Sequence, residues 1–267
     1  MTRLHPVRSA KDISLGDGAA HVRGRVKHGP GLEAAMEREG DRIADLQKVL
    51  YADARYGLLI VLQGRDASGK DGTIRRVFSA VNPQGCQVTS FGVPSAAEQM
   101  HDYLWRVHQA VPSRRMIGIF NRSHYEDVIV PRVHGTLSKK RCERRYEEIN
   151  DFERMLADNH IVVLKFMLHV SRDEQKKRLQ ERLKDPQKNW KFREGDLEDR
   201  RNWDAFTKAY RGLLSGTSTE SAPWYIVPSD DARVRDWLVA RCIADTLESL
   251  GLRYPEADAS LRRLKVE

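Results

Sequence analysis

A glycine-rich turn that directly follows a short apolar run constrains the fold of this chain more than any other feature. The run Leu58–Leu62 precedes the segment GRDASGKDG at residues 64–72, which has the spacing G-x-x-x-x-G-K. Glycines allow a tight turn in which successive N–H groups point inward, and the following helix N-terminus adds partial positive charge. Lys70 adds a full positive charge. The pattern predicts a buried strand, a phosphate-binding loop and a helix, in that order.

Two acidic residues in this turn depart from the usual pattern. Asp71 stands where a Ser or Thr usually binds magnesium, so a metal ion must be held in another way. Asp66 places a carboxylate in a pocket for anions, which is consistent with a divalent cation between it and the phosphates. The alternative is that Asp66 only accepts hydrogen bonds from loop amides. The predicted phosphate-binding residues are Gly64, Ala67, Ser68, Gly69, Lys70, Asp71, Gly72, Arg75 and Arg76.

Short apolar runs alternate with longer helical patterns along the rest of the chain. We predict strands at 58–63, 87–91, 116–120, 161–169 and 224–227. We predict helices at 32–51, 72–81, 95–110, 123–133, 138–158, 171–184, 196–214 and 231–250. Apolar strands separated by helices indicate a three-layer α/β sandwich with a five-stranded, mainly parallel sheet. We expect an N-terminal arm at 1–31 and a single domain at 32–267, with a helical lid at about 171–196.

The charge balance and the cysteines indicate which kind of partner the protein binds and in which cellular compartment it occurs. Lys and Arg outnumber Asp and Glu by 46 to 38, which favours polyanionic partners. No helix-turn-helix, RNP or zinc pattern is evident, so we expect no specific nucleic acid. The apolar runs are shorter than the about 20 residues that cross a bilayer, so we expect no membrane. Three separated cysteines and the absence of a visible signal peptide predict a reduced, cytoplasmic protein.

A second segment places polar residues at the end of an apolar strand. Residues 116–127 read MIGIFNRSHYED. The second phosphate-loop motif begins in this way, but Asn121 stands where an aspartate is usual. Asn121 still offers a carbonyl oxygen to magnesium or to its water shell. Arg122 is expected to face the crevice where open α/β sheets bind ligands.

Longer stretches of the chain resemble a known family. The segments GRDASGKDGTIRRV and FNRSHYEDVIVPRVHG together are similar to motifs of the polyphosphate kinase 2 family. The later segments RYEEINDFERML, RLKDPQKNWKFREGDLEDRRNWDAF and STESAPWYIVP resemble the same family, so the resemblance covers roughly residues 32–250. It implies a phosphate-loop kinase of the thymidylate-kinase-like type, with a helical lid, a basic channel for polyphosphate and Mg²⁺ (or Mn²⁺) as cofactor.

The resemblance also implies an activity. The form NRSHYE at 121–126 looks like the class that accepts both AMP and ADP. The implied enzyme is a kinase that transfers the terminal phosphoryl group of inorganic polyphosphate to AMP, ADP or both, giving ADP and ATP reversibly. The family further implies a homo-oligomer, either a dimer or a tetramer. The alternative is an ATP-dependent kinase of a nucleoside monophosphate or small metabolite, which would use the same loop.

Phosphoryl transfer needs alignment and charge neutralisation more than covalent chemistry, so the expected site is mostly charged. The predicted catalytic residues are Asp66, Lys70, Arg122, Arg178 and Arg182. The predicted metal ligands are Asp66, Asn121 and Glu126, and the predicted nucleotide-binding residues are Asn121, Arg122 and Glu126.

Two of these assignments have plain alternatives. Arg178 and Arg182 lie four residues apart on one helix face and are expected to close over the phosphates. The alternative is that they form part of a solvated helix face. Glu126 is expected to support AMP through a bridging metal or water chain. Its alternative is a surface carboxylate that the dipole of the helix N-terminus favours.

Overall fold

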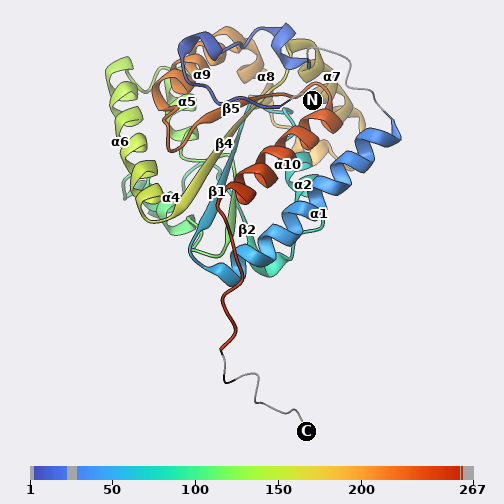
Figure 1. The fold of residues 1–267 in the computed structure, drawn as a ribbon. Coiled ribbons are helices and arrows are strands. Elements are labelled where there is room, and N and C mark those ends of the chain that lie inside the picture. Colours follow the sequence, from blue (N-terminus) through green and yellow to red (C-terminus); the bar gives the residue numbers. More distant parts are fainter. Residues whose placement is uncertain (1–2, 23–28, 259, 261–267) are drawn as a thin grey trace.

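The computed structural model describes residues 3–22, 29–258 and 260, and its centre is one parallel sheet (Figure 1). The strands are β1 (Gly57–Gln63), β2 (Cys86–Ser90), β3 (Ile117–Asn121), β4 (Ile161–His169) and β5 (Trp224–Pro228). Their order is β2-β3-β1-β4-β5, and every neighbouring pair is parallel. Each of the five predicted strands is present to within one residue at either end, which confirms the expected sheet.

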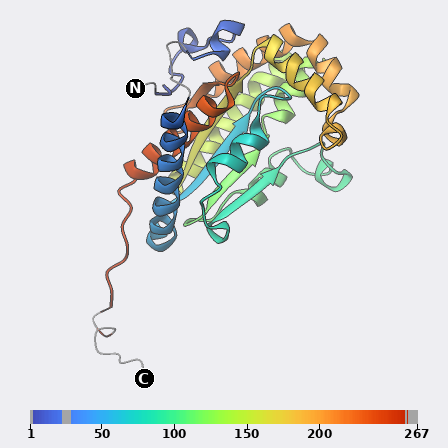
Figure 2. The same cartoon turned by 90° about the vertical axis from the view of Figure 1, so that its right-hand side faces the viewer.

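Helices cover both faces of the sheet (Figures 1 and 2). One face is covered by α1 (Pro30–Asp53), α2 (Lys70–Val77) and α10 (Ala232–Ser249). The other is covered by α4 (Trp105–Ala110), α5 (Glu126–Val133), α6 (Lys139–Asp158) and α9 (Trp203–Thr217). Successive β1 side chains point to opposite faces of the sheet. Leu58 and Ile60 belong to the hydrophobic cluster beneath α1, α2 and α10, whereas Leu59 and Val61 belong to the cluster beneath α4, α5, α6 and α9. The three-layer sandwich is therefore confirmed.

Several predicted helices were wrong in their extent. The helix predicted at 95–110 is two short helices, α3 (Ala96–Gln99) and α4, because the Asp102 carboxylate accepts a hydrogen bond from the Leu104 N–H (2.9 Å) and forms a local turn. The helix predicted at 196–214 is also divided, into α8 (Glu194–Arg201) and α9. Helix α2 begins at Lys70 and ends at Val77 instead of spanning 72–81, and α5 begins three residues later than predicted.

The segment expected to form the lid contains α7 (Arg172–Lys184), a short 3₁₀ helix (Asn189–Lys191) and the start of α8. The other 3₁₀ helices are Ala10–Asp12, Asp17–Ala20 and Pro83–Gly85. Figure 1 shows α7 and α8 at the same end of the molecule.

Residues 3–22 of the expected N-terminal arm pack beside β5, where the Val7 N–H donates to the Trp224 carbonyl (2.8 Å). Residues 1–2 and 23–28 of that arm, and residues 259 and 261–267 of the expected domain, lie outside the described residues. No helix in the described part of the chain combines the length and apolar character that a membrane crossing requires.

Candidate active site

The loop after β1 has a backbone that only certain residues accept. Gly64, Ala67 and Gly69 have φ values of 153°, 59° and 103°, all in the left-handed region. A Cβ atom on Gly64 would lie 2.6 Å from the carbonyl oxygen of Leu168, and one on Gly69 would lie 2.0 Å from Nη1 of Arg235. Backbone conformation therefore favours glycine at both positions, and at position 64 a side chain would also collide with backbone. These constraints explain why glycines stand at these two positions of the motif.

Lys70 is directed into this loop. Its side chain is buried, and Nζ donates hydrogen bonds to the carbonyl oxygens of Gly64 (2.7 Å) and Arg65 (3.2 Å). Lys70 is also the first residue of α2, so its ammonium group lies near the positive end of that helix. Burial lowers the pKa of the Lys70 ammonium group, and the charge of Arg122 lowers it further. An anion bound in the loop would offset both effects.

Two arginines that the sequence analysis missed fasten the loop to distant helices. The Arg65 guanidinium lies 3.8 Å from the Trp203 ring centroid and donates to the Trp203 carbonyl oxygen (2.9 Å). Arg235 of α10 donates to the Ser68 carbonyl oxygen (3.4 Å). These partners are separated by 138 and 167 residues in the chain, so no local signal could have identified them.

Arg178, one of the two arginines predicted for the lid, contacts the loop. Its Nη1 donates to the Ala67 carbonyl oxygen (3.0 Å), and its Nη2 donates to the carbonyl oxygens of Ser229 (2.7 Å) and Asp230 (2.8 Å). Arg178 thus joins α7 to both the phosphate loop and the segment after β5. Its side chain is 17% exposed, so it faces protein more than solvent.

Arg182, one turn further along α7, pairs with Asp196 of α8 (3.2 Å). Asp196 and Asp199 are carboxylates that the sequence analysis did not select. Burial, followed by the charge of Asp66, raises the pKa of both carboxyl groups. The two carboxyl groups therefore lie within electrostatic reach of Asp66. Their i, i+3 spacing, which places both on one helix face, was the available signal.

The ends of β1 and β3 bring the two sequence motifs together. Arg122 donates from Nη2 to the Asp66 carboxylate (2.6 Å), and its Nη1 lies 3.5 Å from Glu126. Arg122 itself has φ of 61°, a conformation that costs energy for a residue with a side chain. Burial raises the pKa of the Glu126 carboxyl group, against the charges of Arg122 and Lys70. The predicted residues Asp66, Lys70, Arg122 and Glu126 thus form one charged group.

Asn121 occupies the position where an aspartate was expected. Its Nδ2 donates to the Asp71 carboxylate (2.9 Å), while its Oδ1 is buried and has no hydrogen-bond partner. A buried carbonyl oxygen without a partner is costly and is well suited to a hard cation. Among the described residues, no group of three His, Cys, Asp or Glu side chains is arranged to hold a metal ion. A cation here would therefore take further oxygen ligands from substrate phosphates, as Mg²⁺ commonly does.

Arg75 and Arg76 lie apart from this charged group. Both line a pocket between α1, α2 and α10, and Arg76 pairs with Glu33 of α1. The structure therefore brings together residues 64–72 and the side chains of β3 and α5, but not these two arginines.

A buried ion pair lies behind the second motif. Lys165 of β4 is fully buried, and its Nζ contacts the Glu153 carboxylate (2.5 Å), the Tyr125 hydroxyl (3.0 Å) and the Thr217 carbonyl oxygen (2.7 Å). The Tyr125 hydroxyl donates to the other oxygen of Glu153 (2.8 Å), and His124 lies 3.4 Å from the same oxygen. Tyr125 directly precedes Glu126, so this network holds the segment that carries the charged group.

Comparisons with known proteins agree with this architecture. The family model described as polyphosphate kinase 2 matches residues 31–253. The chain is 50% identical over 240 residues to the AMP/ADP-polyphosphate phosphotransferase of Meiothermus ruber, covering 89% of this chain and 90% of that protein. It is 46% identical over 274 residues to the ADP-polyphosphate phosphotransferase of Rhodopseudomonas palustris, covering 98% and 95%. The crystal structure of polyphosphate kinase 2 from Arthrobacter aurescens TC1 matches with a TM-score of 0.87 at 38% identity, covering 98% of each chain.

Proposed function

Because the chain belongs to the polyphosphate kinase 2 family, we propose that it transfers the terminal phosphoryl group of inorganic polyphosphate to AMP, ADP or both. The observation that carries this proposal is the junction of the phosphate loop with the β3 end, where Arg122 pairs with Asp66 (2.6 Å) beside the loop that holds the Lys70 ammonium group. The names of the relatives favour polyphosphate as the donor over the ATP-dependent alternative. The products would be ADP and ATP, in a reversible reaction.

The charged group supports a division of roles. Lys70 and the loop amides would hold the transferring phosphoryl group and neutralise its charge. Arg122 would orient the acceptor phosphate. A nucleotide's terminal phosphate has a second pKa of about 6, so its attacking oxygen is ionised at neutral pH without a strong general base.

Asp66, Glu126 and the Oδ1 of Asn121 offer the oxygen donors that would hold Mg²⁺ or Mn²⁺ together with substrate phosphates. When bound, such an ion supplies charge neutralisation between the phosphates.

Four further features are part of the proposal. The segment 171–196 would act as a lid, in which Arg182 reaches the phosphates after leaving Asp196, while Arg178 holds α7 against the loop. Residues 32–267 would form a single domain preceded by the arm. A homo-oligomer, dimer or tetramer, and a cytoplasmic location remain predictions.

The proposed activity has a direct test. Purified protein is mixed with AMP and Mg²⁺, and the donor is either long-chain polyphosphate or ATP. We expect polyphosphate to convert AMP first into ADP and then into ATP, resolved by anion-exchange chromatography. Phosphorylation of AMP by ATP, with none by polyphosphate, would refute the proposal and establish the ATP-dependent alternative.

Glu126 is predicted to affect the two acceptors unequally. AMP is shorter than ADP, so its phosphate lies farther from the donor and depends more on a bridge from the Glu126 carboxylate. We expect Glu126→Ala to lower kcat/KM for AMP about tenfold more than for ADP, which corresponds to about 1.4 kcal/mol of differential binding. Both acceptors are titrated at saturating polyphosphate. The control is Glu143→Ala, which removes an exposed carboxylate of α6. Equal losses for AMP and ADP would contradict a selective role.

A further inference from the structure

Helix α7 holds two consecutive carbonyl groups of the phosphate loop. The Gln175 side chain donates from Nε2 to the Asp66 carbonyl oxygen (3.1 Å). Three residues later, Arg178 donates from Nη1 to the Ala67 carbonyl oxygen (3.0 Å). This spacing places both donors on the face of α7 that meets the loop. Gln175 is only 3% exposed, and none of the roles proposed above uses it.

A residue of α8 fixes the orientation of the Gln175 amide. The amide oxygen Oε1 accepts a hydrogen bond from Nη1 of Arg200 (3.0 Å). Arginine can only donate hydrogen bonds, so the amide oxygen must face Arg200 and the NH₂ group must face the loop. A buried amide with a partner at each end has one favourable orientation. Gln175 therefore presents a donor to the Asp66 carbonyl oxygen.

This carbonyl belongs to a turn that its own sequence does not favour. The Ser68 N–H donates to the Arg65 carbonyl oxygen (3.1 Å), so residues 65–68 form a β-turn with Asp66 and Ala67 at its centre. Ala67 has φ of 59°, whereas φ of Asp66 is not positive. A positive φ at the second central position alone is typical of a type II turn, which usually has glycine there. An alanine is strained in this conformation because its Cβ atom lies close to a carbonyl oxygen.

The competing conformation reverses the peptide group between Asp66 and Ala67. A type I turn, which alanine accepts without strain, differs from a type II turn mainly by this reversal. The carbonyl and N–H of a trans peptide point in opposite directions, so a carbonyl that faces α7 directs the Ala67 N–H away from α7. This N–H donates to no backbone carbonyl in the described part of the chain. It is therefore available to an oxygen of a bound phosphate.

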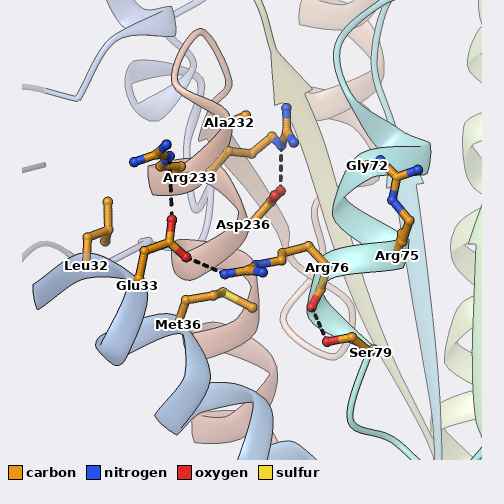
Figure 3. A pocket seen from close by; sticks show the side chains of 11 residues that line it. Leu32, Glu33, Met36, Gly72, Arg75, Arg76, Ser79, Ala232, Arg233 and Asp236 are labelled. Atoms are coloured by element: carbon orange, nitrogen blue, oxygen red, sulfur yellow. Dashed lines mark hydrogen bonds and ion pairs between the residues drawn. The ribbon is translucent and has the colours of Figure 1, made fainter. Parts of the chain in front are cut away.

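The last carbonyl group of the turn is held from α10. Arg235 donates to the Ser68 carbonyl oxygen (3.4 Å). Its Nε donates to Asp236 (2.9 Å), whose side chain lines the pocket drawn in Figure 3. Removing Arg235 would also remove a positive charge, which attracts phosphate from a distance. Gln175 is neutral, so its removal separates the orientation of the loop from charge.

We propose that Gln175 is a positioning residue, which holds the Asp66–Ala67 peptide in the orientation that presents the Ala67 N–H to the phosphate donor. This inference rests on the proposed function. Gln175 acts through the backbone of the loop and not by touching the substrate. Its effect is confined to the donor, because the acceptor side chains Asn121 and Arg122 extend from the end of β3.

The test replaces Gln175 by methionine, which is neutral and similar in length but cannot donate a hydrogen bond. Binding of inorganic triphosphate is measured by calorimetric titration without nucleotide. We expect Kd to rise about tenfold, the effect of one lost buried hydrogen bond. The matched control is Gln180→Met, at an exposed position of the same helix, which should bind as wild type does. Equal affinities for Gln175→Met and wild type would overturn the inference.

A second substitution shows whether the orientation of the peptide is the cause. Glycine accepts a positive φ without strain, so in an Ala67→Gly protein the type II turn depends less on Gln175. We expect Gln175→Met to raise Kd no more than about threefold in this background, against about tenfold with alanine at position 67. An equal rise in both backgrounds would show that Gln175 acts only through the packing of α7, and the inference would be wrong.

Steady-state kinetics give a readout that general destabilisation would not. With polyphosphate and AMP, Gln175→Met should raise KM for polyphosphate about tenfold and leave KM for AMP within about twofold of wild type. A rise shared by both substrates would contradict a role confined to the donor. If Gln175→Met does not fold, Gln175→Asn is measured in the same way. It keeps an amide on α7 but withdraws it by one methylene from the Asp66 carbonyl, so the same changes are expected.

The titration with triphosphate separates this inference from the proposed function. A wild-type protein that never phosphorylates AMP from polyphosphate would refute the proposed function. Weaker binding of triphosphate by Gln175→Met, with recovery in the Ala67→Gly background, would still support the inference. Conversely, phosphoryl transfer by the wild type together with unchanged triphosphate binding by Gln175→Met would refute only the inference. A wild-type protein that binds no triphosphate would overturn both.

Discussion

Replacing Lys70 by alanine is expected to lower kcat about 10³-fold, the effect of losing a cation that neutralises a phosphoryl transition state. The structure gives the reason. Lys70 Nζ is buried inside the loop, where it donates to the carbonyl oxygens of Gly64 and Arg65 at 2.7 and 3.2 Å. In such a site a charge acts with little screening by water. Initial rates with saturating polyphosphate and AMP measure the loss.

The same variant removes two hydrogen bonds within the loop, so folding has to be measured beside activity. Circular dichroism and thermal unfolding report whether the protein is intact. Lys70→Arg keeps the charge but not the compact ammonium group, and we expect it to recover only part of the rate. Lys140→Ala, at an exposed position of α6, is the matched control and should behave as wild type. A folded Lys70→Ala protein with less than tenfold loss would place Lys70 outside the reaction centre.

Replacing Lys165 by methionine is expected to destabilise the protein by about 3–5 kcal/mol, because it leaves the Glu153 charge buried without its partner. Lys165 is fully buried, Glu153 is 1% exposed, and their charged atoms are 2.5 Å apart. For a chain of this size the change corresponds to a Tm lower by about 10 °C. Urea unfolding followed by tryptophan fluorescence measures the free energy.

Two further variants identify the cause. The double variant Lys165→Met with Glu153→Met removes both charges, so it should be more stable than either single variant. Lys139→Met breaks an exposed pair with Glu143 (3.6 Å) on α6 and should cost less than about 0.5 kcal/mol. If Lys165→Met cost no more than this surface control, the pair would not stabilise the fold. Activity should fall in both single variants even where folding is retained, because in each of them the Tyr125 hydroxyl loses one of its two partners, Lys165 or Glu153.

The sequence predicted the strands more closely than the helices. An apolar run such as Leu58–Leu62 is a local signal, and burial on both faces leaves it little alternative to a central strand. The helix predicted at 95–110 was divided because the Asp102 side chain competes with the backbone for the Leu104 N–H. Such a local hydrogen bond depends on one side-chain conformation, which hydrophobic periodicity does not reveal.

The sequence predicted only the part of the site whose signal is local in the chain. Gly64, Gly69 and Lys70 were identifiable because a tight turn imposes fixed spacing on the chain. The contacts that Arg65 and Arg235 make between the loop and distant helices were not predicted, because they join residues far apart in sequence. Arg76 was predicted to bind phosphate, but its partner Glu33 was not predicted, because the two residues are 43 positions apart on different helices.

Covalent spacing and hydrophobic pattern by themselves determined the α/β layers, the turn after β1 and its lysine. Turn sterics and the pattern of buried residues depend on near neighbours in the chain, so they can be recognised directly in the sequence. The tertiary structure alone decided which charges meet: Arg122 with Asp66, Lys165 with Glu153, and Glu33 with Arg76 and Arg233. Ion pairs depend on how strands and helices pack, and a shift of a few ångströms would assign each cation a different partner.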